Sequence, residues 1–170
     1  MKILVVYYSL SGNTALIANT IAKEIGADTL ELKPQKEIMK SGFMKYLWGG
    51  GQVIMKKKPN LLPFIKKVSN YDLIFIGTPV WAWNFTPPLN SFFSTISITD
   101  KKVAVFCTHG GNPGQTLNNM RKELIGNTIL GEIDFLEPLK SDTQNKVIAT
   151  QKWAKSISLL HQKHQQKSPD

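Results

Sequence analysis

This chain has 170 residues, of which 42% are hydrophobic, and a formal net charge of +9. Its length and apolar content predict one globular domain with a core of its own, and no apolar stretch approaches the roughly 20 residues that span a bilayer. The single cysteine, Cys107, excludes an internal disulfide framework and, with few histidines, argues against a structural zinc site. We therefore expect a cytoplasmic protein without a bound metal or a membrane-inserted segment.

The chain begins with an apolar run that predicts a buried strand. Residues Ile3 to Tyr8 are apolar without interruption, as in strands of parallel sheets that are covered on both faces. A helical pattern follows at Asn13–Gly26, and the glycine is its expected end. Between the strand and the body of the helix lie one glycine and four polar side chains: Ser9, Ser11, Gly12, Asn13 and Thr14.

This junction between strand and helix predicts an anion site. Backbone N–H groups and the positive end of the helix dipole face a phosphate that is bound at such a place. The junction lacks the Gly-Lys-Ser/Thr ending of a nucleoside-triphosphate loop and the Gly-x-Gly-x-x-Gly pattern of a dinucleotide site. A simpler interpretation also stands, because serine, asparagine and threonine commonly cap the start of a helix.

The next part of the chain contains short elements and one irregular stretch. A second strand is predicted at Asp28–Leu32. Residues 33–60 contain four glycines, which break any long helix, so we expect short helices and a loop there. A helix is expected at 61–69, and a third buried strand at 71–77.

The second half of the chain continues the alternation of strands and helices. Proline in the first turn and an apolar face predict a helix at Pro87–Ile96. The remaining predicted elements are a strand at Lys102–Cys107, a helix at Pro113–Ile125, a strand at Ile129–Leu136 and a closing helix at Asp142–Leu160. We expect residues 1–160 to form a single domain and residues 161–170 to form a polar C-terminal tail.

Five strands that alternate with helices predict an α/β fold with a doubly wound, five-stranded parallel sheet. Right-handed crossovers place the helices on both faces of such a sheet. We expect the strand order 2-1-3-4-5, which has its switch point between the first and third strands. A ligand is then expected at the carboxyl ends of strands one, three and four.

Unusual residues gather in the three loops that follow these strands. The first loop is Ser9–Thr14, the second covers 78–88, and the glycine-rich third covers 108–116. Aromatic rings at a binding edge predict a flat ligand on which they stack, and glycines let the backbone approach such a ligand closely. For Trp81 and Trp83 the alternative is ordinary packing against the next helix, and for the glycines it is a tight turn.

The Ser-x-Ser-Gly-Asn-Thr sequence at 9–14 resembles the phosphate loop of the flavodoxin family, and the Gly-Thr-Pro-Val-Trp sequence at 77–81 resembles that family's second loop. The resemblance covers essentially the whole chain. It implies FMN as the cofactor, with a phosphate that is held by neutral donors and no lysine. The residues that the resemblance places around FMN are Ser9, Ser11, Gly12, Asn13, Thr14, Thr78, Pro79, Val80, Trp81, Ala82, Trp83, Asn84, Thr108, His109, Gly110, Gly111, Asn112 and Gly114.

Some of these residues have an implied part in holding the flavin. By the resemblance, Thr78 lines the ribityl chain, Trp81 flanks the isoalloxazine ring, and residues 108–114 border its pyrimidine side. His109 is the only histidine near the expected site. It is expected either to form a hydrogen bond with the flavin or to turn outward in the loop.

The resemblance implies an FMN-binding electron-transfer protein that shuttles electrons between redox partner proteins. Two departures from the family pattern keep an alternative open, namely an NAD(P)H-dependent FMN quinone reductase-type enzyme. This chain is basic where electron-carrying flavodoxins are typically acidic, and residues 108–116 contain no tyrosine to cover the outer face of the ring. A basic binding module without redox chemistry is a third hypothesis, although nucleic acid is not an expected partner.

Much of the positive charge lies in one stretch of the chain. From Lys33 to Lys67 there are nine lysines and one acidic residue, Glu37. Such a cluster steers an acidic partner or a nucleotide phosphate toward the protein. We therefore expect a redox partner with an acidic face, or NAD(P)H, while a solvated face that only keeps the protein in solution is the alternative.

Overall fold

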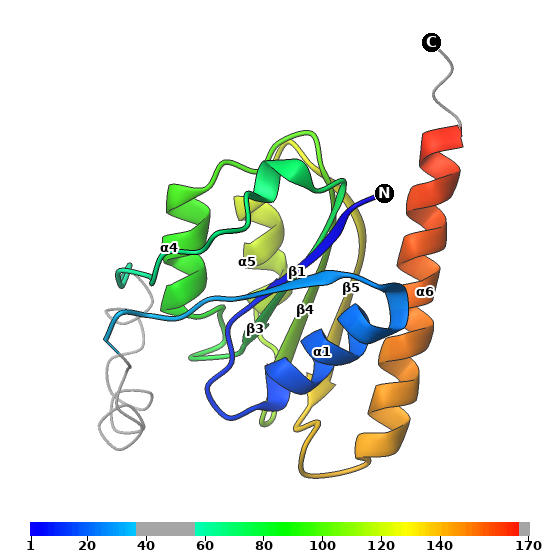
Figure 1. Cartoon of the computed structure of the whole chain (residues 1–170). Helices are drawn as coiled ribbons and strands as arrows, with labels where there is room; N and C mark the ends of the chain where they lie inside the picture. The colour runs from blue at the N-terminus through cyan, green and yellow to red at the C-terminus, as the bar shows by residue number, and fades with distance from the viewer. Residues whose placement is uncertain (37–56, 167–170) are drawn as a thin grey trace.

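The computed structural model describes residues 1–36 and 57–166, so most of the irregular stretch 33–60 lies outside the described residues. The described chain forms a five-stranded parallel sheet in the order β2-β1-β3-β4-β5 (Figure 1). The predicted fold class and strand order are therefore confirmed. The strands are β1 (Ile3–Tyr7), β2 (Asp28–Glu31), β3 (Leu73–Pro79), β4 (Lys102–His109) and β5 (Thr128–Leu136).

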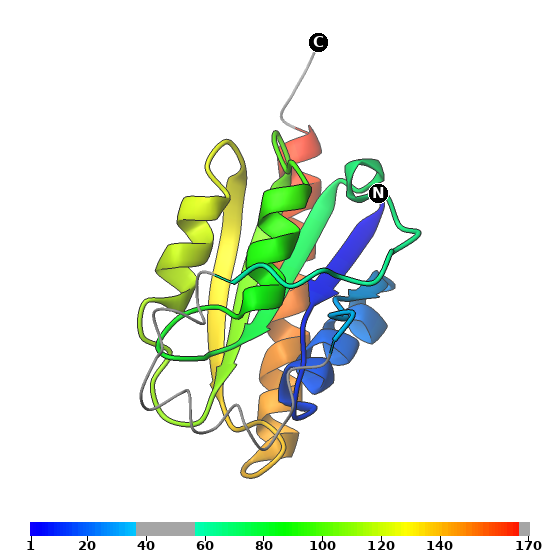
Figure 2. The same cartoon turned by 90° about the vertical axis from the view of Figure 1, so that its left-hand side faces the viewer.

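Helices cover both faces of the sheet. On one face lie α1 (Asn13–Ile25) and α6 (Thr143–Gln166), and on the other lie α4 (Pro87–Thr95) and α5 (Thr116–Glu123), as Figure 2 shows. Right-handed crossovers between parallel strands produce this distribution. None of the helices in the described part of the chain is long and apolar enough to cross a membrane.

The central strands supply side chains to two separate cores. Leu4 and Val6 of β1 pack in the cluster under α4 and α5, whereas Val5 packs in the cluster under α1 and α6. Successive side chains of a strand point to opposite faces, so a strand that is covered on both faces must be apolar at every position. Burial of the strands on both faces therefore explains the uninterrupted apolar runs in the sequence.

The first helix has the bounds that the sequence predicts. Gly12 precedes it with a φ of +89°, and Gly26 follows it with a φ of +64°. Both values lie in the left-handed region, which glycine adopts at little cost. The chain therefore turns sharply at both ends of α1, and the turn at Gly12 brings the polar residues of the first loop to the edge of the sheet.

The predicted helix at 61–69 is wrong. The N–H of Leu62 donates to the carbonyl of Lys33 at 2.7 Å in an antiparallel contact, which holds this segment extended. Pro63 also disfavours a helical conformation for the residue before it. Between residue 57 and β3, the one helical element is a short 3₁₀ turn, η1 (Val68–Asn70).

Two helices have bounds that differ from the predicted ones. The helix expected from Pro113 begins only at Thr116, because Gly114 has a φ of +56° and turns the chain before α5. The closing helix continues beyond Leu160 to Gln166. A buried residue, His161, lies in this extension, so packing continues where the sequence becomes polar.

Candidate functional site

Four loops meet at the carboxyl edge of the sheet, on the lower side of the view in Figure 1. Three of them are the loops that the sequence singled out, which follow β1, β3 and β4. The fourth is the segment 137–142, which follows β5 and leads into α6. Because all five strands are parallel, their carboxyl ends share one edge, and the side chains of these loops are brought together there.

The first loop leaves the start of α1 open toward this edge. Gly12 is the residue before the helix and offers no side chain to cap it. The N–H groups of a first helical turn have no partner within the helix and carry the positive end of its dipole. The Ser9 hydroxyl accepts a hydrogen bond from the N–H of Ala15 at 3.2 Å. The loop is therefore held in a shape that can receive an anion.

A buried hydrogen bond joins the first loop to the end of β4. The hydroxyls of Thr14 and Thr108 lie 2.8 Å apart, and both residues are almost fully buried. Each hydroxyl can donate one hydrogen bond and accept others. The pair therefore fixes the start of α1 against β4 and still has hydrogen-bonding capacity for a ligand.

The second loop contains a tight turn with an unusual backbone. The N–H and carbonyl groups of Trp81 and Asn84 bond to each other at 2.9 and 3.0 Å. The two residues between them, Ala82 and Trp83, have φ values of +47° and +60°. A side chain makes this left-handed conformation costly, by about 1–2 kcal/mol for each residue. The side chain of Asn84 accepts from the Asn119 amide at 3.1 Å, which anchors the turn to α5.

The two tryptophans of this turn differ in how much of each is exposed to solvent. Trp81 is 6% exposed, and its ring meets that of Tyr8 edge-on with 5.7 Å between centroids. Trp83 is 68% exposed. The role of Trp81 beside a flavin therefore stays a prediction, and Trp83 offers the accessible ring at this edge.

The second and third loops touch through their backbones. A Cβ atom on Gly114 would lie 2.4 Å from Cβ and 2.9 Å from Cα of Trp83. The N–H of Gln115 donates to the Trp83 carbonyl at 3.0 Å, and Asn112 accepts from the N–H of Gly114 at 2.7 Å. Glycine is thus required at position 114 both for its left-handed φ and for this close approach.

The side chain of His109 is buried beside the fifth strand and does not project into solvent. Its Nε2 atom is 2.8 Å from a carboxylate oxygen of Asp134, and its side chain is only 6% exposed. Its Nδ1 atom is buried and has no hydrogen-bond partner among the described residues. A buried nitrogen without a partner is costly, so this atom is a candidate for a hydrogen bond to a bound molecule.

Cys107 is a core residue. It is fully buried. Burial raises the pKa of its thiol, and the nearby carboxylates of Asp134 and Glu132 raise this pKa further. The thiol is therefore protonated at neutral pH and poorly nucleophilic. No three metal-ligating side chains lie together in the described ranges.

The structure also shows what two other predicted residues do. Thr78 is fully buried, and its hydroxyl accepts a hydrogen bond from the N–H of Thr86 at 3.2 Å. The N–H of Val80 donates to the carbonyl of Thr108 at 2.8 Å. Both residues therefore hold the second loop in place, whatever else they contact.

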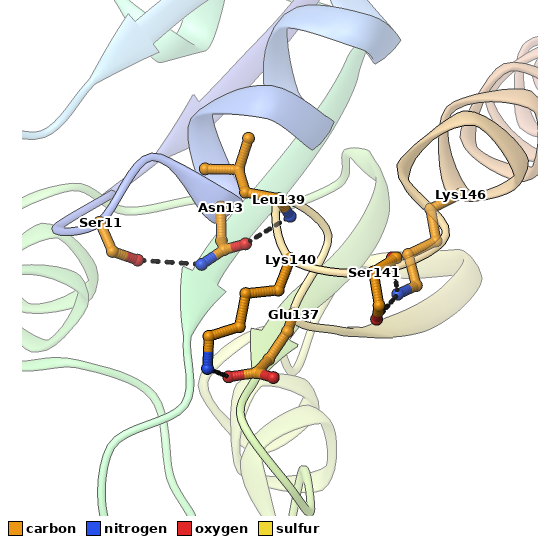
Figure 3. A network of polar contacts seen from close by, with 7 residues as sticks. All are labelled: Ser11, Asn13, Glu137, Leu139, Lys140, Ser141 and Lys146. Atoms are coloured by element: carbon orange, nitrogen blue, oxygen red, sulfur yellow. Dashed lines mark hydrogen bonds and ion pairs between the residues drawn. The ribbon is translucent and has the colours of Figure 1, made fainter.

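The fourth loop was missed by sequence reasoning because it carries no recognisable motif. Its N–H group at Leu139 donates to the side-chain oxygen of Asn13 at 2.9 Å (Figure 3). The N–H of Glu137 donates to the carbonyl of His109, also at 2.9 Å. The predicted strand order was the available signal, since it places the end of the fifth strand at the same edge as the other loops.

Comparison with known proteins gives a family and several relatives. A family model described as flavodoxin matches residues 2–150. The flavodoxin-like domain-containing protein BilS of Clostridioides difficile (strain CD3) is 26% identical over 170 residues, which are 100% of this chain and 77% of that protein.

Solved structures share the fold over most of its length. A protein from Bacteroides eggerthii DSM 20697, described as a flavoprotein, is 25% identical with a TM-score of 0.75, covering 92% of this chain and 98% of that one. A flavoprotein from Lactobacillus acidophilus NCFM, solved in complex with FMN, is 24% identical with a TM-score of 0.67, covering 85% of this chain and 98% of that one.

Proposed function

Because this chain belongs to the flavodoxin family, we propose that it binds FMN at the carboxyl edge of its sheet and shuttles electrons between redox partner proteins. The observation that carries the proposal is the first loop. There, Gly12 turns the chain with a left-handed φ and leaves the first turn of α1 open to an anion. An FMN-bound flavoprotein of the same fold supports this choice of cofactor.

The residues at this edge fit the parts of FMN. Neutral hydroxyl, amide and backbone N–H donors of residues 9–14 suit a phosphate at the start of a helix. The exposed ring of Trp83 suits the face of an isoalloxazine ring. The buried Nδ1 atom of His109 and the backbone of the glycine-rich third loop suit the polar edge of that ring. When bound, FMN supplies reversible acceptance of electrons, while the chain binds it, orients it and limits the access of water.

The direct test of the proposal is the absorbance spectrum of the purified protein, with the released cofactor identified by mass. A yellow protein that releases FMN is the expected result. A colourless protein that does not take up added FMN would contradict the proposal and favour a basic binding module without redox chemistry.

We expect Thr14→Val to weaken FMN binding by about 1–3 kcal/mol, because a charged phosphate oxygen or the buried Thr108 hydroxyl then lacks a donor. Ser11→Ala should act in the same direction. Thr14→Ser keeps the hydroxyl and is the matched control, with near wild-type affinity. Titration of apo-protein with FMN, followed by flavin fluorescence, measures the change. Unchanged affinity in both Thr14→Val and Ser11→Ala would place the phosphate elsewhere.

A second candidate function is that of an NAD(P)H-dependent FMN quinone reductase-type enzyme. The observation that favours it is the third loop, where residues 110–115 contain no aromatic side chain to cover a flavin, so a nicotinamide could approach the outer face of the ring. Steady-state oxidation of NADPH with a quinone as acceptor separates the two functions. Turnover without any partner protein would favour the enzyme, and its absence favours the carrier.

The lysine-rich stretch bears on the choice of partner. Two of its described lysines are paired, Lys33 with Glu31 at 3.3 Å and Lys66 with Asp28 at 2.9 Å, while Lys57 and Lys58 are exposed. We propose a redox partner with an acidic face, met in the cytoplasm. Electron transfer to that partner should slow as the salt concentration rises, because screening shortens the Debye length to about 10 Å at 0.1 M.

A further inference from the structure

The fourth loop determines how the side chain of Asn13 is oriented. The N–H of Leu139 can only donate, so the Asn13 atom that faces it at 2.9 Å must be the amide oxygen. The Asn13 nitrogen is thereby turned toward Ser11, whose hydroxyl it meets at 3.1 Å. Both contacts are drawn in Figure 3. The amide donor of Asn13 is thus held on the side of the first loop by a residue from the far end of the chain.

The same loop packs against the turn itself. A Cβ atom on Gly12 would lie 3.1 Å from the Cδ1 atom of Leu139. Glu137 has a φ of +39°, a conformation that a non-glycine residue adopts only when its surroundings hold it there. The fourth loop therefore packs closely against the first loop, where the anion site is proposed.

The fourth loop contains Lys140, which forms an exposed ion pair. The ammonium of Lys140 lies 2.8 Å from Oε1 of Glu137, and the lysine side chain is 74% exposed. Exposed pairs of this kind contribute little to stability, so the lysine can leave Glu137 at small cost. In Figure 3 the Lys140 side chain extends on the side of the loop that faces Ser11 and Asn13, whereas Lys146 turns to Ser141 on the other side.

We propose that Lys140 leaves Glu137 and pairs with the FMN phosphate. Lys140 would then favour phosphorylated over unphosphorylated flavin. This inference rests on the proposed function. Lys140 follows directly on Leu139, whose N–H already touches Asn13. Consecutive Cα atoms are about 3.8 Å apart, and the flexible four-carbon stem of lysine lets its ammonium move well beyond that distance. A phosphate that carries up to two negative charges attracts the ammonium more strongly than one exposed carboxylate does.

The family resemblance implies neutral donors and no lysine at the phosphate, whereas in this proposal a single, exchangeable lysine approaches it from the fourth loop. In this arrangement Glu137 is a positioning residue with two effects. It keeps Lys140 at the site before the ligand arrives, and it competes with the phosphate afterwards. Removing the lysine and removing the carboxylate should therefore change FMN affinity in opposite directions, which a purely structural role for the pair does not predict.

The experiment is a titration of apo-protein with FMN and, separately, with riboflavin, at low salt. Lys140→Met keeps the aliphatic stem and should weaken FMN binding about tenfold with riboflavin binding unchanged, as expected for the loss of one charge-assisted contact. Glu137→Gln should tighten FMN binding by about threefold. Lys146→Met, a lysine on the other side of the same segment, is the matched control and should leave both affinities unchanged.

Three results in the variants would overturn the inference. The first is equal weakening of FMN and riboflavin in Lys140→Met, which would mean a structural role. The second is no change in that variant, and the third is weaker FMN binding in Glu137→Gln. A wild-type protein that binds FMN and riboflavin equally would overturn this inference and leave flavin binding intact. A wild-type protein that binds neither would overturn the proposed function together with it.

Discussion

Replacing Gly77 with alanine is expected to lower the free energy of unfolding by about 3 kcal/mol, the upper part of the range for overpacked cores. Gly77 lies in β3, beside Phe106 of β4. A Cβ atom at Gly77 would lie 2.0–2.6 Å from three atoms of the Phe106 ring. That ring is fully buried and packs against Trp153 of α6 with 6.4 Å between centroids. Because the ring is enclosed in the core, either the ring or the sheet must shift to admit the new atom. Urea unfolding of the apo-protein measures the loss.

A second substitution tests the cause of this loss. Phe106→Leu shortens the side chain, so the Gly77→Ala/Phe106→Leu protein should be more stable than the sum of the two single effects predicts. Gly111→Ala is the matched control for stability, since no atom lies within 4 Å of a Cβ there, and it should change the free energy of unfolding by less than about 0.5 kcal/mol. Additive effects of the pair would show that contact with the ring is not the cause.

Trp83→Ala is expected to raise the fluorescence of bound FMN strongly and to weaken FMN binding by about 1–3 kcal/mol, the size of an aromatic stacking contact. Trp83 is 68% exposed in a turn at the carboxyl edge, while Trp81 is 6% exposed against Tyr8. A ring that is accessible can stack on a ligand without first leaving the core. Flavin emission and an FMN titration, both on the same variants, measure the two effects.

Conservative changes separate the two tryptophans. Trp83→Phe keeps an aromatic face and should retain most of the affinity. Trp81→Phe should act chiefly on the stability of the apo-protein, because it alters a buried contact. If Trp81→Ala raises flavin emission and Trp83→Ala does not, the ring-flanking residue is Trp81, as the family resemblance implies.

The sheet and three of its loops could be predicted because their signals are local. A strand that is buried on both faces must be apolar throughout, as Ile3 to Tyr7 are, and the first loop is recognisable from six consecutive residues. The alternation of elements predicts a doubly wound parallel sheet, and the strand order is the one that the family resemblance implies. These features depend on the near neighbours of each residue in the chain.

The features that local patterns do not show have the opposite origin. The segment at 61–69 is extended because the partner of the Leu62 N–H is the carbonyl of Lys33, and no local pattern shows that contact. The burial of Trp81 depends on tertiary packing, including its contact with Tyr8. The fourth loop has no motif, and its contacts are with residues far away in the sequence, among them Asn13 and His109. Each of these features depends on tertiary contacts, which a local sequence pattern does not show.

The contact between Leu139 and Asn13 joins residues that are 126 positions apart, and this separation has a consequence for biosynthesis. A ribosome adds about 5–20 residues per second, so about 6–25 s pass between the synthesis of the two residues. By the last part of that interval the nascent chain contains the first three loops but still lacks Leu139, the residue that orients Asn13. We therefore expect tight loading of the cofactor to come late, after translation has passed the fifth strand, so that unfinished chains do not consume FMN.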